Sequence, residues 1–134
     1  MRFFLNQNAG GHEIEEREDK KSPFQFHQRL PGYAATPLLD APQLAQELGI
    51  KQLLLKDESS RLGLPAFKIL GASWAIYRVL QERNGCSFEP WQTLDELIQR
   101  LVPLRPLTLV TATDDNHGRA VAHVAALFGL DAKI

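Results

Sequence analysis

One lysine interrupts the apolar stretch GLPAFKILGASWAIYRVL, which occupies residues 63–80. Lys68 follows Phe67 and opens a predicted helix that is apolar on nearly every side, so we expect an internal helix. Burial and the positive end of the helix dipole both disfavour a charged amine. Because a neutral amine attacks carbonyl carbon, Lys68 is a candidate to bond a carbonyl cofactor such as pyridoxal phosphate. The alternative is a helix-start lysine whose stem lies along apolar surface while its ammonium reaches water.

A second candidate site is the turn VTATDDNHG, residues 110–118, which we expect to lead from a strand into a helix. The structural interpretation is that Asp114 or Asp115 caps the helix. The functional interpretation is that the free N–H groups at the helix start bind an anion, such as a substrate carboxylate. Asn116 would then donate a hydrogen bond to a cofactor oxygen, and Asp114 would exchange a proton beside it.

Hydrophobic periodicity predicts the elements that must position these two loops. In order, they are a charged flexible arm at 1–22, a short helical turn within 22–33, a helix from Pro42 to Gly49, a strand from Gln52 to Leu55, a helix within 63–80, a helix at 93–102, a buried strand at 106–113, a helix at 116–130 and the start of a strand at 131–134. This alternation predicts an α/β fold, part of a three-layer parallel sheet with helices on both faces. Ligands bind such sheets at the carboxyl ends of strands, where both candidate loops lie.

The bulk composition excludes several classes of function. A net charge of −1 over 134 residues argues against a nucleic-acid partner, and a hydrophobic content of 44% suits one folded domain. The four histidines and one cysteine lack metal-ligand spacing, so we expect no metal. No run reaches the roughly 18 apolar residues of a membrane span, and the start lacks the apolar segment of a signal peptide. We therefore predict a cytoplasmic protein with no membrane partner.

Both loops together carry a family resemblance. KDESSRLGLPAFKILGASWA and TATDDNHGRAVAHVAALFGL resemble the fold type II pyridoxal-phosphate enzymes, the group around tryptophan synthase β subunit and threonine dehydratase. Within that group the chain is most similar to diaminopropionate ammonia-lyases, as FHQRLPGYAATPL, RLGLPAFK and the aspartate at 114 indicate. The resemblance spans residues 24–134 and implies the N-terminal third or so of a family member. Residues 23–134 would then be the N-terminal part of a catalytic domain.

The resemblance implies how the cofactor would be held. Lys68 matches the lysine that bonds covalently to pyridoxal phosphate, and Phe67 lies beside it at the cofactor. Asn116 matches the asparagine that contacts the phenolic oxygen of the pyridine ring. The implied enzyme is a homodimer that acts on a small amino acid.

The resemblance also implies how the substrate would be bound. Thr113, Asn116 and His117 lie in the loop that receives the substrate α-carboxylate in relatives. Asp114 matches an aspartate that relatives use as base for the D-isomer of 2,3-diaminopropionate. The implied reaction is α,β-elimination, which yields pyruvate and ammonia.

Two departures from the family pattern leave alternatives open. Asp115 stands where the family has glycine, and its charge would repel a nearby carboxylate by about 1–4 kcal/mol at about 4 Å. The glycine-rich loop for the cofactor phosphate would lie beyond residue 134, so we interpret the chain as truncated and expect weak or no cofactor binding by it alone. One alternative is an incompetent half-fold that serves in binding or dimerisation. The other is a threonine or serine dehydratase, although relatives of that kind carry a small neutral residue at position 114.

Overall fold

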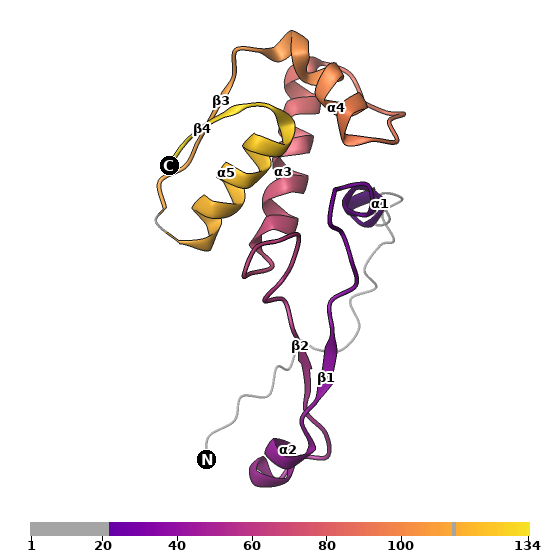
Figure 1. Cartoon of the computed structure of the whole chain (residues 1–134), viewed down its shortest axis with the longest axis vertical. Helices are drawn as coiled ribbons and strands as arrows, with labels where there is room; N and C mark the ends of the chain where they lie inside the picture. Colours follow the sequence, from indigo (N-terminus) through magenta and orange to yellow (C-terminus); the bar gives the residue numbers. More distant parts are fainter. Residues whose placement is uncertain (1–21, 114) are drawn as a thin grey trace, which may run out of the picture.

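The computed structural model describes residues 22–113 and 115–134 (Figure 1). Most of the predicted arm, residues 1–21, and the candidate base Asp114 lie outside the described residues. In chain order the elements are α1 (Ser22–Gln28), β1 (Leu38–Asp40), α2 (Pro42–Leu48), β2 (Leu54–Lys56), α3 (Lys68–Asn84), α4 (Leu94–Leu101), the 3-10 helix η2 (Val102–Leu104), β3 (Thr108–Val110), α5 (Asn116–Phe128) and β4 (Asp131–Lys133). This mixture of helices and strands confirms the predicted α/β class. The sequence pattern did not predict β1.

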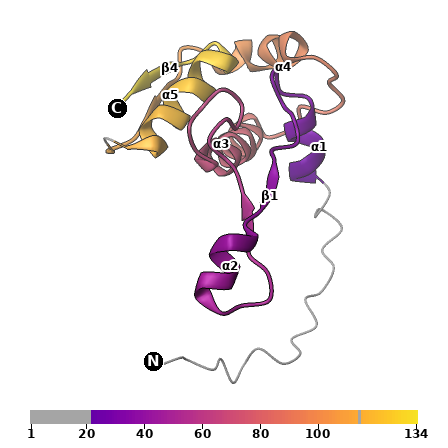
Figure 2. The same cartoon turned by 60° about the horizontal axis from the view of Figure 1, so that its bottom comes forward.

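Strands β1 and β2 form a two-stranded pair that projects from the helical body and carries α2 at its far end (Figures 1 and 2). The strands are antiparallel, with Leu39 opposite Leu55, which corrects the prediction of a parallel strand here. Their connection reverses the chain direction and is closed by a ladder hydrogen bond from Ala41 N–H to the carbonyl of Leu53. The predicted end of α2 is confirmed: Gly49, with φ of +65°, adopts the left-handed conformation of a helix C-cap.

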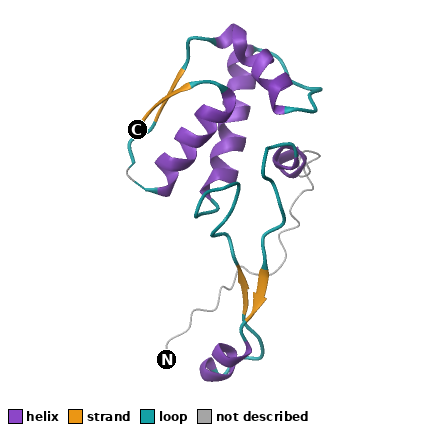
Figure 3. Ribbon diagram, in the orientation of Figure 1, coloured by secondary structure: helices purple, strands orange, loops and turns teal. Residues whose placement is uncertain are grey.

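Strands β3 and β4 pair in parallel, as predicted, with Leu109 opposite Ala132. Helix α5 connects the two strands and packs against both of them and against α3 (Figure 3). The sequence predicts that β3 is buried, but Thr108 and Val110 are exposed, so this prediction is wrong for one face of the strand. The reason is that the described helices cover one face of this pair.

The hydrophobic core lies among α1, α3, α4 and α5. Helix α3 contributes Ile69 and Tyr77 to it, and α5 contributes Val124 and Phe128. Trp91, from the loop before α4, is completely buried at its centre. This core fixes α3 against α5, and both helices begin at one end of their shared interface (Figure 1).

Glu58 and Arg61 form an ion pair within the loop after β2, and both residues hydrogen-bond to the segment before β1. Arg61 donates to the Glu58 carboxylate from Nε at 2.6 Å and from Nη2 at 2.7 Å. The Thr36 hydroxyl donates to the same carboxylate at 2.6 Å, and Arg61 also donates to the carbonyl of Ala34 at 2.8 Å. The polar residues 56–59, KDES, therefore belong to a structural cluster at the base of the β1–β2 pair.

We expect acid to weaken this cluster. Hydrogen bonds from Arg61, and then from Thr36, lower the pKa of Glu58 from 4.5 to about 2. A carboxyl with a depressed pKa stabilises the fold above its unfolded pKa, and this contribution disappears as the pH falls towards the folded value. Urea unfolding should therefore show a deficit for Glu58→Gln at about pH 7 that shrinks at about pH 3. Glu47→Gln, on exposed α2, is the control, and a deficit for Glu58→Gln that is equal at both pH values would contradict the prediction.

Candidate functional site

Lys68 is the first residue of α3, and its ammonium reaches the start of α5. Its Nζ lies 2.9 Å from Oδ2 of Asp115, the N-cap residue of α5. Because α3 and α5 pack together, their first turns meet although these two residues are 47 positions apart in the sequence. The two loops predicted as candidate sites therefore form one site.

The Lys68 side chain is 40% exposed, so its ammonium reaches water, as one of the two interpretations of the sequence has it. Phe67, the residue before it, is 62% exposed. Among the described elements α3 packs against α1 and α5, and this leaves Gly71 and Val79 exposed on its other side. The ammonium is thus held by a carboxylate partner in a position that water reaches.

Asp115 organises the turn through its backbone and its carboxylate. Thr113 Oγ1 accepts a hydrogen bond from the Asp115 N–H at 3.3 Å, and Asp115 Oδ1 accepts one from the N–H of Asn116. The hydrogen bond from Lys68, and then that from the Asn116 N–H, lower the pKa of Asp115. Of the two aspartates predicted as caps, Asp115 is the N-cap of α5, and it is ionised at neutral pH.

A hollow of about 460 Å³ opens beside Lys68. Its mainly apolar lining comes from the first turns of α3 and α5 and consists of Phe67, Lys68, Leu70, Gly71, Ala72 and His117. An apolar wall with a few polar groups at its rim is typical of a ligand site. Sequence reasoning missed Leu70, Gly71 and Ala72, which helical spacing from Phe67 and Lys68 could have found.

The other candidate residues, Thr113 and Asn116, lie at the turn and at the start of α5. Thr113 lines a second, smaller hollow of about 200 Å³ together with Asp115 and Gly118. Asn116 is half-buried as the first residue of α5, next to His117, which is exposed. The structure thus brings Lys68, Phe67, Thr113, Asn116 and His117 to one end of the helix pair.

Gly118 leaves no space for a side chain. A Cβ atom at this position would lie 2.8 Å from the carbonyl oxygen of Thr113 and 2.9 Å from Cγ2 of Ile134. The first turn of α5 therefore packs tightly between the turn that precedes it and the residue that follows β4.

We expect Gly118→Ala to lower the free energy of unfolding by about 1–3 kcal/mol, because the backbone must shift to admit the methyl group. Gly71→Ala is the matched control: it also lies in a helix, but no atom lies within 4 Å of its added Cβ. Since alanine is the better helix former, this control should gain up to about 1 kcal/mol. Urea unfolding followed by circular dichroism measures both, and equal changes would contradict tight packing at Gly118.

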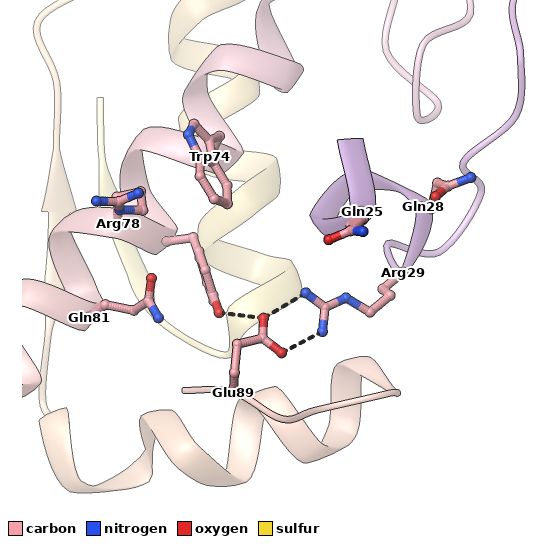
Figure 4. Close-up of a pocket in the computed structure, with 8 residues that line it drawn as sticks. Gln25, Gln28, Arg29, Trp74, Arg78, Gln81 and Glu89 are labelled. Atoms are coloured by element: carbon pink, nitrogen blue, oxygen red, sulfur yellow. Dashed lines mark hydrogen bonds and ion pairs between the residues drawn. The ribbon is translucent and has the colours of Figure 1, made fainter. Parts of the chain in front are cut away.

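A different hollow, of about 570 Å³, lies between α1, α3 and the loop before α4 (Figure 4). Arg29 donates to Glu89 from Nη1 at 2.9 Å and from Nη2 at 2.7 Å, and the Tyr77 hydroxyl donates to Glu89 at 3.0 Å. The Glu89 carboxylate, which lines this hollow, therefore already has hydrogen-bond partners within the protein. The residues that line this hollow include none of the predicted site residues.

Residues 22–113 and 115–134 contain no group of three potential metal ligands. In the same part of the chain, no helix has the length and apolar character needed to cross a membrane.

A match to a known protein family defines the class of this protein. Residues 29–134 match the family described as pyridoxal-phosphate dependent enzyme. The chain belongs to this family, whose enzymes use pyridoxal phosphate as cofactor. The predicted cofactor is confirmed at the level of the family.

The chain is similar in particular to diaminopropionate ammonia-lyases. It is 40% identical to the enzyme of Salmonella typhimurium over 97% of this chain and 30% of that protein. It is 43% identical to the enzyme of Escherichia coli strain K12 over 82% of this chain and 27% of that protein. The chain therefore spans less than a third of the length of these curated relatives.

Solved structures give the same result. The crystal structure of the Escherichia coli diaminopropionate ammonia lyase in apo form matches with a TM-score of 0.73 and 40% identity, over 84% of this chain and 30% of that one. The structure of that enzyme in complex with D-serine matches with a TM-score of 0.74 and 41% identity, over 84% of this chain and 28% of that one. The resemblance in sequence thus extends to the fold.

Proposed function

We propose that this chain is the N-terminal part of a pyridoxal-phosphate-dependent lyase that eliminates ammonia from 2,3-diaminopropionate. The observation that carries the proposal is the convergence of Lys68 and the Thr113–His117 turn on one end of the α3–α5 pair. The identity of 40% to 43% with diaminopropionate ammonia-lyases supports the reaction and the substrate.

The described residues fit the cofactor. Lys68 offers an amine at the rim of an apolar hollow, and Phe67 and Leu70 give that hollow apolar walls suited to a planar ring. In the proposed enzyme Lys68 holds the cofactor covalently, and Asn116 donates a hydrogen bond to its ring oxygen. When bound, the cofactor supplies an electron sink for the carbanion that forms at the substrate α-carbon.

The remaining roles concern the substrate. Thr113, Asn116 and His117 are proposed to orient the α-carboxylate, because the N–H groups at the start of α5 favour an anion. Asp114 is proposed as the base that removes the α-proton of the D-isomer. A small amino acid as substrate is supported by the Escherichia coli relative, which has been solved in complex with D-serine. The cytoplasmic compartment and the homodimer remain predictions from the sequence.

A chimera tests the proposal, because the relatives are longer than this chain. Residues 24–134 replace the matching segment of the Escherichia coli enzyme, and formation of the 2-oxo acid product is measured: pyruvate from 2,3-diaminopropionate and serine, and 2-oxobutyrate from threonine. We expect bound pyridoxal phosphate and the highest kcat/KM with 2,3-diaminopropionate. A folded chimera that binds no cofactor would contradict the cofactor site. One that binds it and prefers threonine would contradict the substrate.

A further inference from the structure

Asp115 connects two elements that are distant in the sequence. One carboxylate oxygen accepts a hydrogen bond from Nζ of Lys68 at 2.9 Å, and the other accepts one from the N–H of Asn116. The same carboxylate therefore caps α5 and holds the lysine at the start of α3. The Thr113 hydroxyl accepts a hydrogen bond from the N–H of Asp115. This hydrogen bond restricts the backbone from which the Asp115 carboxylate projects.

The charges around this carboxylate favour Lys68 as its partner. Among the described residues, the charged groups beside Asp115 are Lys68 of α3 and Arg119, one turn along α5. Within the same part of the chain, Lys68 is the one at ion-pair distance from the carboxylate. The two side chains are 40% and 59% exposed, so dissolved salt reaches the pair and screens it.

We propose that Asp115 is a positioning residue that holds the Lys68 ammonium against the start of α5, and that this ion pair must open before the amine can bond to an aldehyde. The inference rests on the proposed function, because it concerns the amine that would hold the cofactor. In that reaction the ammonium releases one proton to solvent water and the nitrogen lone pair attacks the aldehyde carbon. The carbonyl oxygen then leaves as water with the two remaining protons of the nitrogen, and a carbon–nitrogen double bond replaces the carbon–oxygen double bond. Oxidation states do not change, and no further reactant is needed.

The ion pair between Asp115 and Lys68 affects how the amine can react. A glycine, which the family pattern has here, offers no carboxylate to compete for the amine. An aspartate orients the amine towards α5 and slows its capture by an aldehyde. Asp115 would thus control how readily Lys68 reacts, without itself touching the reacting carbon.

The ion pair itself is tested by NMR on the whole 134-residue chain, with carboxyl carbons observed during an acid titration. In the wild-type protein the pKa of Asp115 should lie below its ordinary 3.8. In Lys68→Gln, which removes the charge and keeps a polar side chain, that pKa should return towards 3.8. An Asp115 pKa that is the same in both proteins would overturn the inference.

The effect on reactivity is tested with formaldehyde and dimethylamine–borane, followed by peptide mapping of the methylated lysines. Both reagents are uncharged, so repulsion between Asp115 and an anionic reagent does not enter. Asp115→Asn should raise the rate at Lys68 about two- to fivefold, the size expected for loss of an exposed ion pair. Lys51, in the same chain, should react at an unchanged rate, and added salt should reduce the difference at Lys68.

Asp95→Asn is the matched control, since Asp95 also lies at the first turn of a helix, α4. It should leave the rate at Lys68 unchanged. Equal rates at Lys68 in wild type and Asp115→Asn would overturn the inference even if the chimera is an active lyase. Faster labelling in Asp115→Asn would support it even if the chimera fails to bind pyridoxal phosphate, so the two proposals fail separately.

Discussion

Replacing Lys68 with alanine in the chimera should abolish the visible absorbance of lysine-bound pyridoxal phosphate and lower pyruvate formation by about a thousandfold or more. The reason is chemical: an amine bonds to the cofactor aldehyde, and alanine has no group that can replace it. The position makes the loss specific, because this amine lies at the rim of the apolar hollow between the first turns of α3 and α5. Absorbance spectroscopy and a pyruvate assay measure the two effects.

Two further variants separate loss of the amine from loss of charge. Lys68→Arg keeps a cation that can pair with Asp115, yet its guanidinium does not perform carbonyl chemistry, so it should be as inactive as the alanine variant. Lys51→Ala removes an exposed lysine between α2 and β2 and should behave as wild type. Cofactor absorbance that survives in Lys68→Ala would show that another lysine holds the aldehyde.

Replacing Trp91 with alanine should cost about 3–5 kcal/mol, a large part of the 5–15 kcal/mol that is typical of a whole domain. Trp91 is fully buried, and its ring centroid lies 6.0 Å from that of Phe26 and 6.1 Å from that of Tyr77. Its indole N–H donates to the Tyr77 hydroxyl at 3.1 Å, and the guanidinium of Arg29 lies 3.7 Å from its ring centroid. Alanine would remove all of these contacts and leave a cavity.

Urea unfolding followed by circular dichroism measures this loss. Trp91→Phe keeps an aromatic ring and gives up the indole donor, so its loss should be clearly smaller than that of alanine. Phe24→Ala, at an exposed position on α1, should change the free energy of unfolding by no more than about 0.5 kcal/mol. A loss at Trp91 as small as that at Phe24 would contradict its place in the core.

The elements that the sequence predicted best are those whose ends are set by neighbouring residues. Helix α2 starts at Pro42 and ends before Gly49, as their conformational preferences require. Helix α4 is capped by Thr93, whose hydroxyl accepts the N–H of Glu96. Capping and turn formation depend on residues a few positions apart, so a linear sequence displays them.

Features that depend on distant residues could not be predicted in this way. The antiparallel pairing of β1 with β2 depends on the direction in which their connection returns, which hydrophobic periodicity does not contain. Likewise, the apolar pattern around Lys68 indicated an internal helix, although the described neighbours leave one side of α3 exposed. The burial of a helix depends on how many other elements pack around it, and the sequence of the helix alone does not show that number.

The candidate site was predicted in outline and corrected in detail. The sequence placed Lys68 and the turn before α5 in one site, and the two do meet. They meet because α3 packs against α5, whereas the strand before Lys68, β2, belongs to the separate antiparallel pair and not to the parallel sheet that the carboxyl-end rule requires. The sequence indicated that Asp115 would repel a substrate carboxylate, but it did not reveal that this carboxylate pairs with Lys68. To predict a contact between residues that are so distant in the sequence, one must know how the two helices that carry them are placed relative to each other.

The most direct test of the account is to reduce the pyridoxal-phosphate-loaded chimera with borohydride and to locate the attached pyridoxyl group by peptide mapping. Reduction makes the bond between cofactor and lysine permanent, so the map identifies the lysine that held it. We predict that the group is on Lys68. A map that places it on another lysine, with Lys68 unmodified, would contradict the assignment of this site.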